Sequence, residues 1–172
     1  PRATRPEVFY AENRIPLGLL RTVVPAAPDA WIVALERYGT MPFHEVVEPA
    51  IRYARDGFCV HPLMQQFIAN FAENYRLWPQ NAAIFLPGGK VPQDGDLFVQ
   101  SDLAASLSYM AAESRAADAK GGRMAGLAAA RAAFYRGDLA QAMVRYHREN
   151  GGWLAEEDLV NYSSEVEKAV SI

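Results

Sequence analysis

The stretch that decides the fold runs from residue 104 to residue 133 and reads AASLSYMAAESRAADAKGGRMAGLAAARAA. Thirteen of its thirty residues are alanine. Alanine has the highest helix propensity, and small side chains allow helices to approach one another closely. Gly121-Gly122 is the break in this pattern. The stretch therefore predicts helix on both sides of an interruption at these two glycines.

Helical patterns continue upstream of this stretch. Trp31, Ile32, Leu35 and Tyr38 are spaced as one apolar helix face, which Gly39 is expected to end as a left-handed cap. The segment His44 to Arg55 is expected to split at Pro49 and to end at Gly57. Two further rows of apolar side chains are predicted to face the interior of the protein: Val47, Ile51 and Ala54, and then Leu63, Phe67, Phe71 and Tyr75 after a helix start at Pro62.

Downstream, a helix with Leu139, Met143 and Tyr146 is expected between Gly137 and Gly151-Gly152, and a short helix over 155–162. Residues 79–99 are rich in turn-forming residues. The fold class is therefore mainly α, with little β structure of its own. We expect residues 1–172 to be a single helical segment of a larger protein. Residues 1–25 are expected to be irregular, and 163–172 to be the start of a truncated strand, because Glu165-Val166-Glu167 alternates.

Composition excludes several classes of function. The chain has 17 Lys and Arg against 20 Asp and Glu, a net charge of −3, so no broad basic field for nucleic acid or a membrane surface is expected. No apolar run approaches the length of a membrane span. No signal peptide is expected at the start, and the compartment, cytoplasmic or periplasmic, cannot be read. The one cysteine excludes an internal disulfide and a cysteine-based zinc site.

Residue types that carry chemistry are present but isolated. Cys59 lies between Phe58 and Val60 with His61 nearby, which is typical of a buried, inert thiol. His44 and His147 lack the i, i+4 pairing of metal ligands. Asp94-Gly95-Asp96 lacks the other ligands of a calcium loop and is interpreted as a turn. Five tyrosines are expected in or beside the core: Tyr10, Tyr38, Tyr53, Tyr109 and Tyr162. No catalytic, substrate-binding or metal-binding residue is therefore predicted in this chain.

One basic cluster leaves two interpretations open. Arg2, Arg5, Arg14 and Arg21 lie within the first 21 residues, opposed by Glu7 and Glu12. Arginine side chains can bind a carboxylate through two parallel hydrogen bonds. The cluster is interpreted as an ordinary solvated surface, with an anion-binding domain as the alternative.

Taken together, an ordered set of short motifs resembles the large chain of the gamma-glutamyltransferase family. The set covers residues 24 to 162 and consists of Val24-Pro25, Ala30-Trp31, Arg37-Tyr38-Gly39-Thr40-Met41-Pro42, Pro49-Ala50-Ile51, Ala54-Arg55-Asp56-Gly57-Phe58, Val60, Gly95-Asp96, Gln100, Asp102-Leu103-Ala104, Ser106-Leu107, Phe134-Tyr135-Arg136-Gly137, Leu139-Ala140, Gly151-Gly152, Leu154, Asp158-Leu159 and Tyr162.

This resemblance implies a helical subdomain of an αββα N-terminal-nucleophile hydrolase. In that family a precursor cleaves itself, and the new N-terminal threonine attacks a gamma-glutamyl or related amide, without a cofactor. Thr4, Thr22 and Thr40 do not match the nucleophile, which is expected beyond Ile172. The partners implied are the remainder of the precursor, namely the large-chain sheet and the small chain, and a small-molecule amide substrate. The isolated chain is expected to be inactive.

Arg2 and Arg5 do not match the family's substrate-carboxylate arginine, so that role is not transferred to them. Two departures from the family pattern leave the reaction open. Val24-Pro25-Ala26 stands where the family has Val-Pro-Gly. The segment Ala111 to Arg131 is longer than in typical transpeptidases and more similar to the amidohydrolase branch. Simple amide hydrolysis without transfer is therefore one alternative, and a non-enzymatic helical interaction module is the other. An exposed apolar patch would be the sign of that module.

Overall fold

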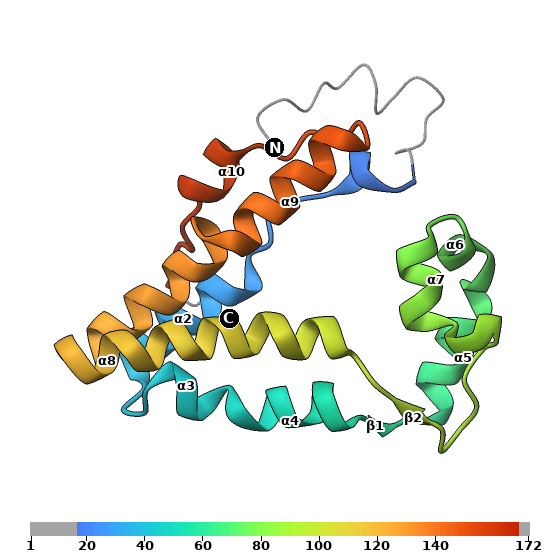
Figure 1. Cartoon of the computed structure of the whole chain (residues 1–172), viewed down its shortest axis with the longest axis horizontal. Helices are drawn as coiled ribbons and strands as arrows, with labels where there is room; N and C mark the ends of the chain where they lie inside the picture. Colours follow the sequence, from blue (N-terminus) through green and yellow to red (C-terminus); the bar gives the residue numbers. More distant parts are fainter. Residues whose placement is uncertain (1–16, 169–172) are drawn as a thin grey trace. The chain divides into compact units, whose positions relative to one another are not determined.

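The structure is a computed structural model that describes residues 17–168; residues 1–16 and 169–172 lie outside the described part. The chain divides into two compact units, Pro1–Val46 with Tyr109–Ile172, and Val47–Ser108. The described elements of the first unit are η1 (Leu19–Arg21), α2 (Ala27–Tyr38), α3 (Phe43–Val46), α9 (Asp138–Glu149), α10 (Glu156–Val160) and most of α8 (Ser101–Tyr135) (Figure 1).

The alanine-rich helix α8 turns back on itself within the first unit (Figure 1). Gly122 adopts φ 77° and ψ 178°, a conformation that breaks the helix and that L side chains disfavour. A Cβ placed on Gly126 would lie 2.9 Å from the carbonyl oxygen of Ser114. In a straight helix these two residues would be about 18 Å apart, so the two arms pack side by side. The predicted break at Gly121-Gly122 is confirmed.

The C-terminal helices of the first unit pack around Tyr135. Tyr135, Ala140, Leu154 and Leu159 form a buried apolar cluster. Gly137 precedes α9 at a point where a Cβ would lie 2.8 Å from the Ala133 carbonyl oxygen. At the start of α10, the Asp158 carboxylate accepts a hydrogen bond from the Ala155 N–H at 3.0 Å. These contacts confirm the predicted helices on either side of Gly151-Gly152.

The second unit combines short helices with a two-stranded antiparallel ladder. Its elements are α4 (Glu48–Asp56), β1 (Phe58–Cys59), α5 (Pro62–Asn70), α6 (Ala72–Arg76), α7 (Pro79–Phe85), η2 (Pro87–Gly89), β2 (Leu97–Phe98) and the first turns of α8. Phe58 pairs with Phe98 and Cys59 with Leu97. The predicted split falls at Val47, which separates α3 from α4, and Pro49 lies in the first turn of α4. Gly57 ends α4 with φ 88°, as predicted.

The core of the second unit is aromatic and aliphatic. Val60, Ile68, Ala72, Leu86 and Phe98 are its buried members. The rings of Tyr75 and Phe85 stack with centroids 4.5 Å apart, and the Phe85 ring lies 6.0 Å from that of Phe98. The ladder therefore carries Phe98 into this core, although each strand is only two residues long.

Two of the predicted apolar faces are wrong in part, although Tyr75 packs against the core of the second unit as predicted. Residues Leu63, Phe67 and Phe71 are exposed by 57%, 56% and 47%, and the side chains that meet the core lie one position along, at Met64, Ile68 and Ala72. In α2, Ile32 is fully buried, as predicted, but the buried face continues through Pro28 and Asp29 and leaves Trp31 and Tyr38 exposed. Neighbouring elements, which periodicity does not encode, decide which face is covered.

Gly39 ends α2, but not as a left-handed cap. Its φ is −92°, which any residue adopts. A Cβ on Gly39 would instead lie 2.9 Å from both the Leu35 side chain and its carbonyl oxygen. Glycine is thus required here for space rather than for backbone conformation.

The predicted fold class, mainly α with little β structure, is confirmed. The described part of the predicted irregular segment, 17–25, contains one short 3-10 helix. Residues 163–168 carry no regular element, and 169–172 lie outside the described part, so the truncated strand stays a prediction. Within residues 17–168, every helix is too short or too polar to cross a lipid bilayer.

Candidate functional site

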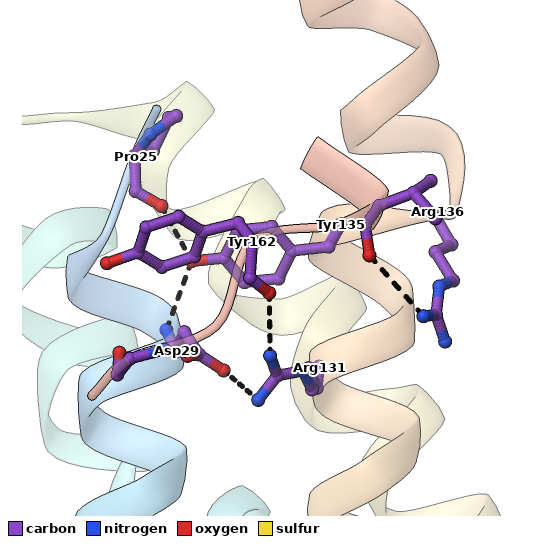
Figure 2. A network of polar contacts seen from close by, with 8 residues as sticks. Pro25, Asp29, Arg131, Tyr135, Arg136 and Tyr162 are labelled. Carbon is purple, nitrogen blue, oxygen red and sulfur yellow. Dashed lines mark hydrogen bonds and ion pairs between the residues drawn. The ribbon is translucent and has the colours of Figure 1, made fainter. Parts of the chain in front are cut away.

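The most developed polar site of the first unit is centred on Asp29. Pro28 and Asp29 occupy the first turn of α2, where a carboxylate is favoured by the helix dipole. The Asp29 side chain is 0% exposed, so its charge must be compensated by partners. One carboxylate oxygen forms an ion pair with Arg131, and the other accepts a hydrogen bond from the Ser164 N–H at 2.6 Å. The chain positions 29, 131 and 164 are thereby joined. Figure 2 shows the contact between Asp29 and Arg131.

Tyr135 adds a second connection between the same segments. Its hydroxyl donates a hydrogen bond to the Pro25 carbonyl at 2.6 Å and accepts one from the Asp29 N–H at 3.2 Å. Burial raises the pKa of Tyr135 to about 12, and the Asp29 charge adds to this, whereas the Asp29 N–H and the Arg131 cation oppose it. The hydroxyl therefore keeps its proton at neutral pH and can donate to Pro25.

Arg131 is held from two further directions. Its guanidinium donates to the Tyr162 carbonyl at 2.9 Å, and its Cζ lies 5.9 Å from the centre of the Tyr135 ring. The Tyr135 and Tyr162 rings stack with centroids 5.8 Å apart. Figure 2 shows the two rings lying between Pro25 and the helix that carries Arg131 and Arg136. We call Asp29, Arg131 and Tyr135 the Asp29 clamp.

The Asp29 clamp can position chain segments but offers no reacting group. Both Asp29 carboxylate oxygens, the Tyr135 hydroxyl and two nitrogens of Arg131 are engaged with other parts of the chain, and Asp29 is closed to solvent. A nucleophile must reach its substrate and have a base within hydrogen-bond distance. The clamp therefore fixes the segment before α2 and the segment after α10 against α8.

A serine, a histidine and an aspartate also lie near one another in the first unit. His44 Nδ1 is 3.8 Å from the Asp118 carboxylate, and Asp118 lies one turn after Ser114 on α8. Ser114 is 0% exposed and packs against Gly126. A serine closed to substrate cannot act as a nucleophile, so this set is a packing arrangement of the α8 hairpin.

Among residues 17–168, no hydrogen bond joins the Cys59 thiol to a base. Cys59 is exposed at the end of β1, which corrects the expected buried position: its strand is paired on one side only, and Val60 instead takes the buried place. His61 serves as the N-cap of α5, where its Nδ1 accepts from the Met64 N–H at 3.3 Å. His147 is buried, which lowers its pKa, and its Nδ1 faces the Leu154 N–H at 3.4 Å.

The remaining sequence-predicted positions have structural roles or lie outside the described part. Asp94-Gly95-Asp96 forms a turn in which the Asp96 carboxylate accepts from the Gln93 N–H. Among residues 17–168, no group of three His, Cys, Asp or Glu side chains could hold a metal ion. Arg2, Arg5, Arg14 and Tyr10 lie outside the described residues.

The tyrosines divide into two groups. Tyr109 and Tyr162 are partly buried as predicted, whereas Tyr38 and Tyr53 are exposed, because they point away from the buried faces of α2 and α4. Tyr135 is buried, although the sequence predicts it only as part of the family pattern and not as a core tyrosine.

Sequence reasoning also missed Asp29 and Arg131. Each is a single charged residue among apolar neighbours: Asp29 before Ala30-Trp31-Ile32, and Arg131 between alanines. A lone charge on an otherwise apolar face is the signal that could have indicated a buried ion pair. It could not indicate which of the other charged residues was the partner.

Comparison with known proteins assigns the family. A family model described as Gamma-glutamyltranspeptidase matches residues 1–172. The chain belongs to the gamma-glutamyltranspeptidase family. Three of the residues in the family-like motif set, Pro25, Tyr135 and Tyr162, contact or belong to the Asp29 clamp.

Individual relatives agree with this assignment. The chain is 38% identical over 154 residues to the acylase ACY 1 proenzyme of Pseudomonas sp. (strain SE83), covering 90% of this chain and 25% of the relative. It is 32% identical over 146 residues to the glutathione hydrolase proenzyme of Escherichia coli (strain K12), covering 84% of this chain and 22% of the relative. The chain thus spans about a quarter of the length of the curated relatives it matches.

A solved structure supports the same helical arrangement. The crystal structure of cephalosporin acylase from Bacillus halodurans superposes on 91% of this chain and 27% of that chain, with a TM-score of 0.74 and 29% sequence identity. The predicted helical part of an N-terminal-nucleophile hydrolase is therefore confirmed at the level of fold and family.

Proposed function

We propose that this chain is a scaffold part of the large chain of an enzyme that cleaves or transfers gamma-glutamyl or related amides. The observation that carries the proposal is the family match along residues 1–172. It is supported by the similarity to proenzymes about four times as long, and by a buried polar site, the Asp29 clamp, that is engaged in holding the chain together.

In the proposed reaction the nucleophile is an N-terminal threonine on polypeptide outside this chain. Its hydroxyl oxygen bonds to the amide carbonyl carbon while its own amine takes the hydroxyl proton, which gives a tetrahedral oxyanion that becomes an ester when the C–N bond breaks. Hydrogen-bond donors stabilise the oxyanion, the C–N bond breaks, and the proton passes to the departing amine. Water or an amino acid then takes the acyl group from the ester. No cofactor is required by these steps.

The contribution of this chain is positional. The Asp29 clamp holds the segment at Ser164 by a hydrogen bond to a buried carboxylate, which fixes the direction in which the chain leaves α10. A catalytic site whose reacting groups must be placed to well under 1 Å needs such rigid support. The clamp would supply it to the polypeptide that follows.

The test is an assay of two proteins on a gamma-glutamyl anilide. The 172-residue chain should release no aniline above the uncatalysed rate, whereas the full-length precursor, after self-cleavage, should release it. Turnover by the isolated chain would contradict the assignment of a scaffold role. An inactive precursor that has cleaved itself would contradict the assigned substrate class.

A second candidate is an amide hydrolase of the same family without transfer activity. The higher identity to the acylase proenzyme, 38% against 32% for the glutathione hydrolase proenzyme, favours it. The processed full-length enzyme should then release the acid at the same rate with and without a dipeptide acceptor. Formation of a gamma-glutamyl dipeptide would exclude this candidate.

The third candidate, a non-enzymatic interaction module, is favoured by the exposed apolar row Leu63, Phe67 and Phe71. Exposed apolar rows mark contact surfaces, but a surface for the rest of a precursor has the same appearance. Loss of self-cleavage in a full-length precursor carrying Phe67→Ser would assign the row to the enzyme. Unchanged self-cleavage and turnover would indicate that the row contacts an external partner.

A further inference from the structure

A cleft of about 270 Å³ lies along α9 in the first unit. Three arginines line it, Arg136 before α9 and Arg145 and Arg148 on the helix itself. Ala140 and Val144 give it an apolar part, and Glu156, in the first turn of α10, is its one carboxylate. The cleft is separate from the Asp29 clamp, whose residues do not line it.

The arginines of the cleft carry uncompensated charge. In residues 17–168, neither Arg145 nor Arg148 forms an ion pair, and Arg136 contacts only the Val160 carbonyl, at 3.5 Å. Arg145 and Arg148 are three positions apart on one helix, so they are neighbours, and like charges at this spacing repel. Three guanidinium groups against one carboxylate leave two excess positive charges.

We propose that this cleft binds a small dicarboxylate. Guanidinium groups bind carboxylates through paired hydrogen bonds, and two carboxylates would match the two excess positive charges. Ala140 and Val144 would contact the methylene chain between them. Pockets for small molecules usually have about 300–1,000 Å³, and this cleft of about 270 Å³ lies just below that range, so it takes a small ligand. The proposal goes beyond the proposed function and does not depend on it.

The experiment is a titration of the 172-residue chain with adipate, in which calorimetry measures binding and backbone amide NMR locates it. Binding should saturate at one adipate per chain, should shift the amides of α9, and should weaken with added salt because the charges are exposed. Hexanoate, which has one carboxylate, should bind at least about tenfold more weakly, since one charge-assisted contact is lost.

Single substitutions locate the site. Arg145→Gln and Arg148→Gln should each weaken adipate binding about tenfold, and glutamine preserves helix propensity. Glu156→Gln should tighten binding, because it removes the one repelling carboxylate; a merely structural residue would not give a gain. The matched control is Arg115→Gln, an exposed arginine of α8 that does not line the cleft, and it should leave binding unchanged.

Three outcomes would overturn the proposal. The first is the absence of saturable adipate binding. The second is an equal loss for Arg115→Gln and Arg145→Gln, which would show nonspecific attraction to surface charge. The third is binding by the 172-residue chain but not by the full-length precursor, which would show that polypeptide, and not a free acid, covers the cleft.

Discussion

In the first unit, a buried ion pair and side-chain hydrogen bonds join distant segments in addition to apolar contact, whereas the core of the second unit joins them by apolar side chains alone. Asp29, Arg131 and Tyr135 connect chain positions more than a hundred residues apart. Val60, Ile68, Leu86 and Phe98 bring the ladder, α5 and the segment after α7 together without a buried charge among them. The same task is thus performed by two kinds of force.

The difference has a physical consequence. The free energy gained by apolar burial is proportional to the buried area and has no preferred direction. An apolar core therefore tolerates substitutions that preserve side-chain volume. A buried ion pair requires each partner, because removal of one leaves the other charge without compensation. Single substitutions of polar residues should therefore destabilise the first unit most. Losses of side-chain volume should destabilise the second unit most.

The largest effect is expected from Arg131→Met. It keeps much of the side-chain volume but leaves the Asp29 carboxylate buried without its ion-pair partner. The free energy of unfolding, measured by urea denaturation, should fall by about 3–5 kcal/mol. Arg115→Met, an exposed arginine on the same helix, should change it by less than about 0.5 kcal/mol.

A double variant sharpens this test. Asp29→Asn removes the charge that Arg131→Met leaves unpaired, so the double variant should be less destabilised than the sum of the two single variants. Additive losses would show that the two side chains contribute independently, and the comparison between the units would then fail.

The next effect is expected from Leu86→Ala in the second unit. Leu86 is 2% exposed and belongs to the aromatic core, so its truncation should cost about 3 kcal/mol through lost transfer energy and a cavity. The control is Leu63→Ala, the same change at an exposed position. It should cost less than about 1 kcal/mol, and equal losses at the two positions would contradict the observed orientation of α5.

The α5 result also shows what the sequence can and cannot predict. The spacing of Leu63, Phe67 and Phe71 correctly predicted a helix from Pro62. A parallel row, Met64, Ile68 and Ala72, has the same spacing, and the core covers that row. Rows one residue apart differ by about 100° around the helix axis, and only the neighbouring elements decide between them.

Local chemistry, in contrast, was sufficient for the hairpin of α8. Alanine favours helix wherever the chain lies, and Gly122 breaks it because the required φ disfavours other residues. The Asp29 clamp had no such local signal, since its charges are 102 positions apart. Its aromatic member was visible only in the family-like motif Phe134-Tyr135-Arg136-Gly137.

The smallest effect is expected from Tyr135→Phe, and its pH dependence identifies the contact. Loss of the hydroxyl leaves the Pro25 carbonyl and the Asp29 N–H without this partner, which should cost about 1–2 kcal/mol at pH 7. The folded-state pKa of about 12 lies above the usual value of 10, so the unfolded chain loses this proton first as pH rises. The stabilisation by Tyr135 is therefore complete below pH 10 and is lost as pH rises from about 10 to about 12.

Denaturation of the wild type and of Tyr135→Phe across this range should show the difference between their free energies of unfolding shrinking, whereas Tyr53→Phe, at an exposed tyrosine, should follow the wild type throughout. A difference that stays constant above pH 11 would show that the hydroxyl stabilises the first unit by packing and not by the two hydrogen bonds.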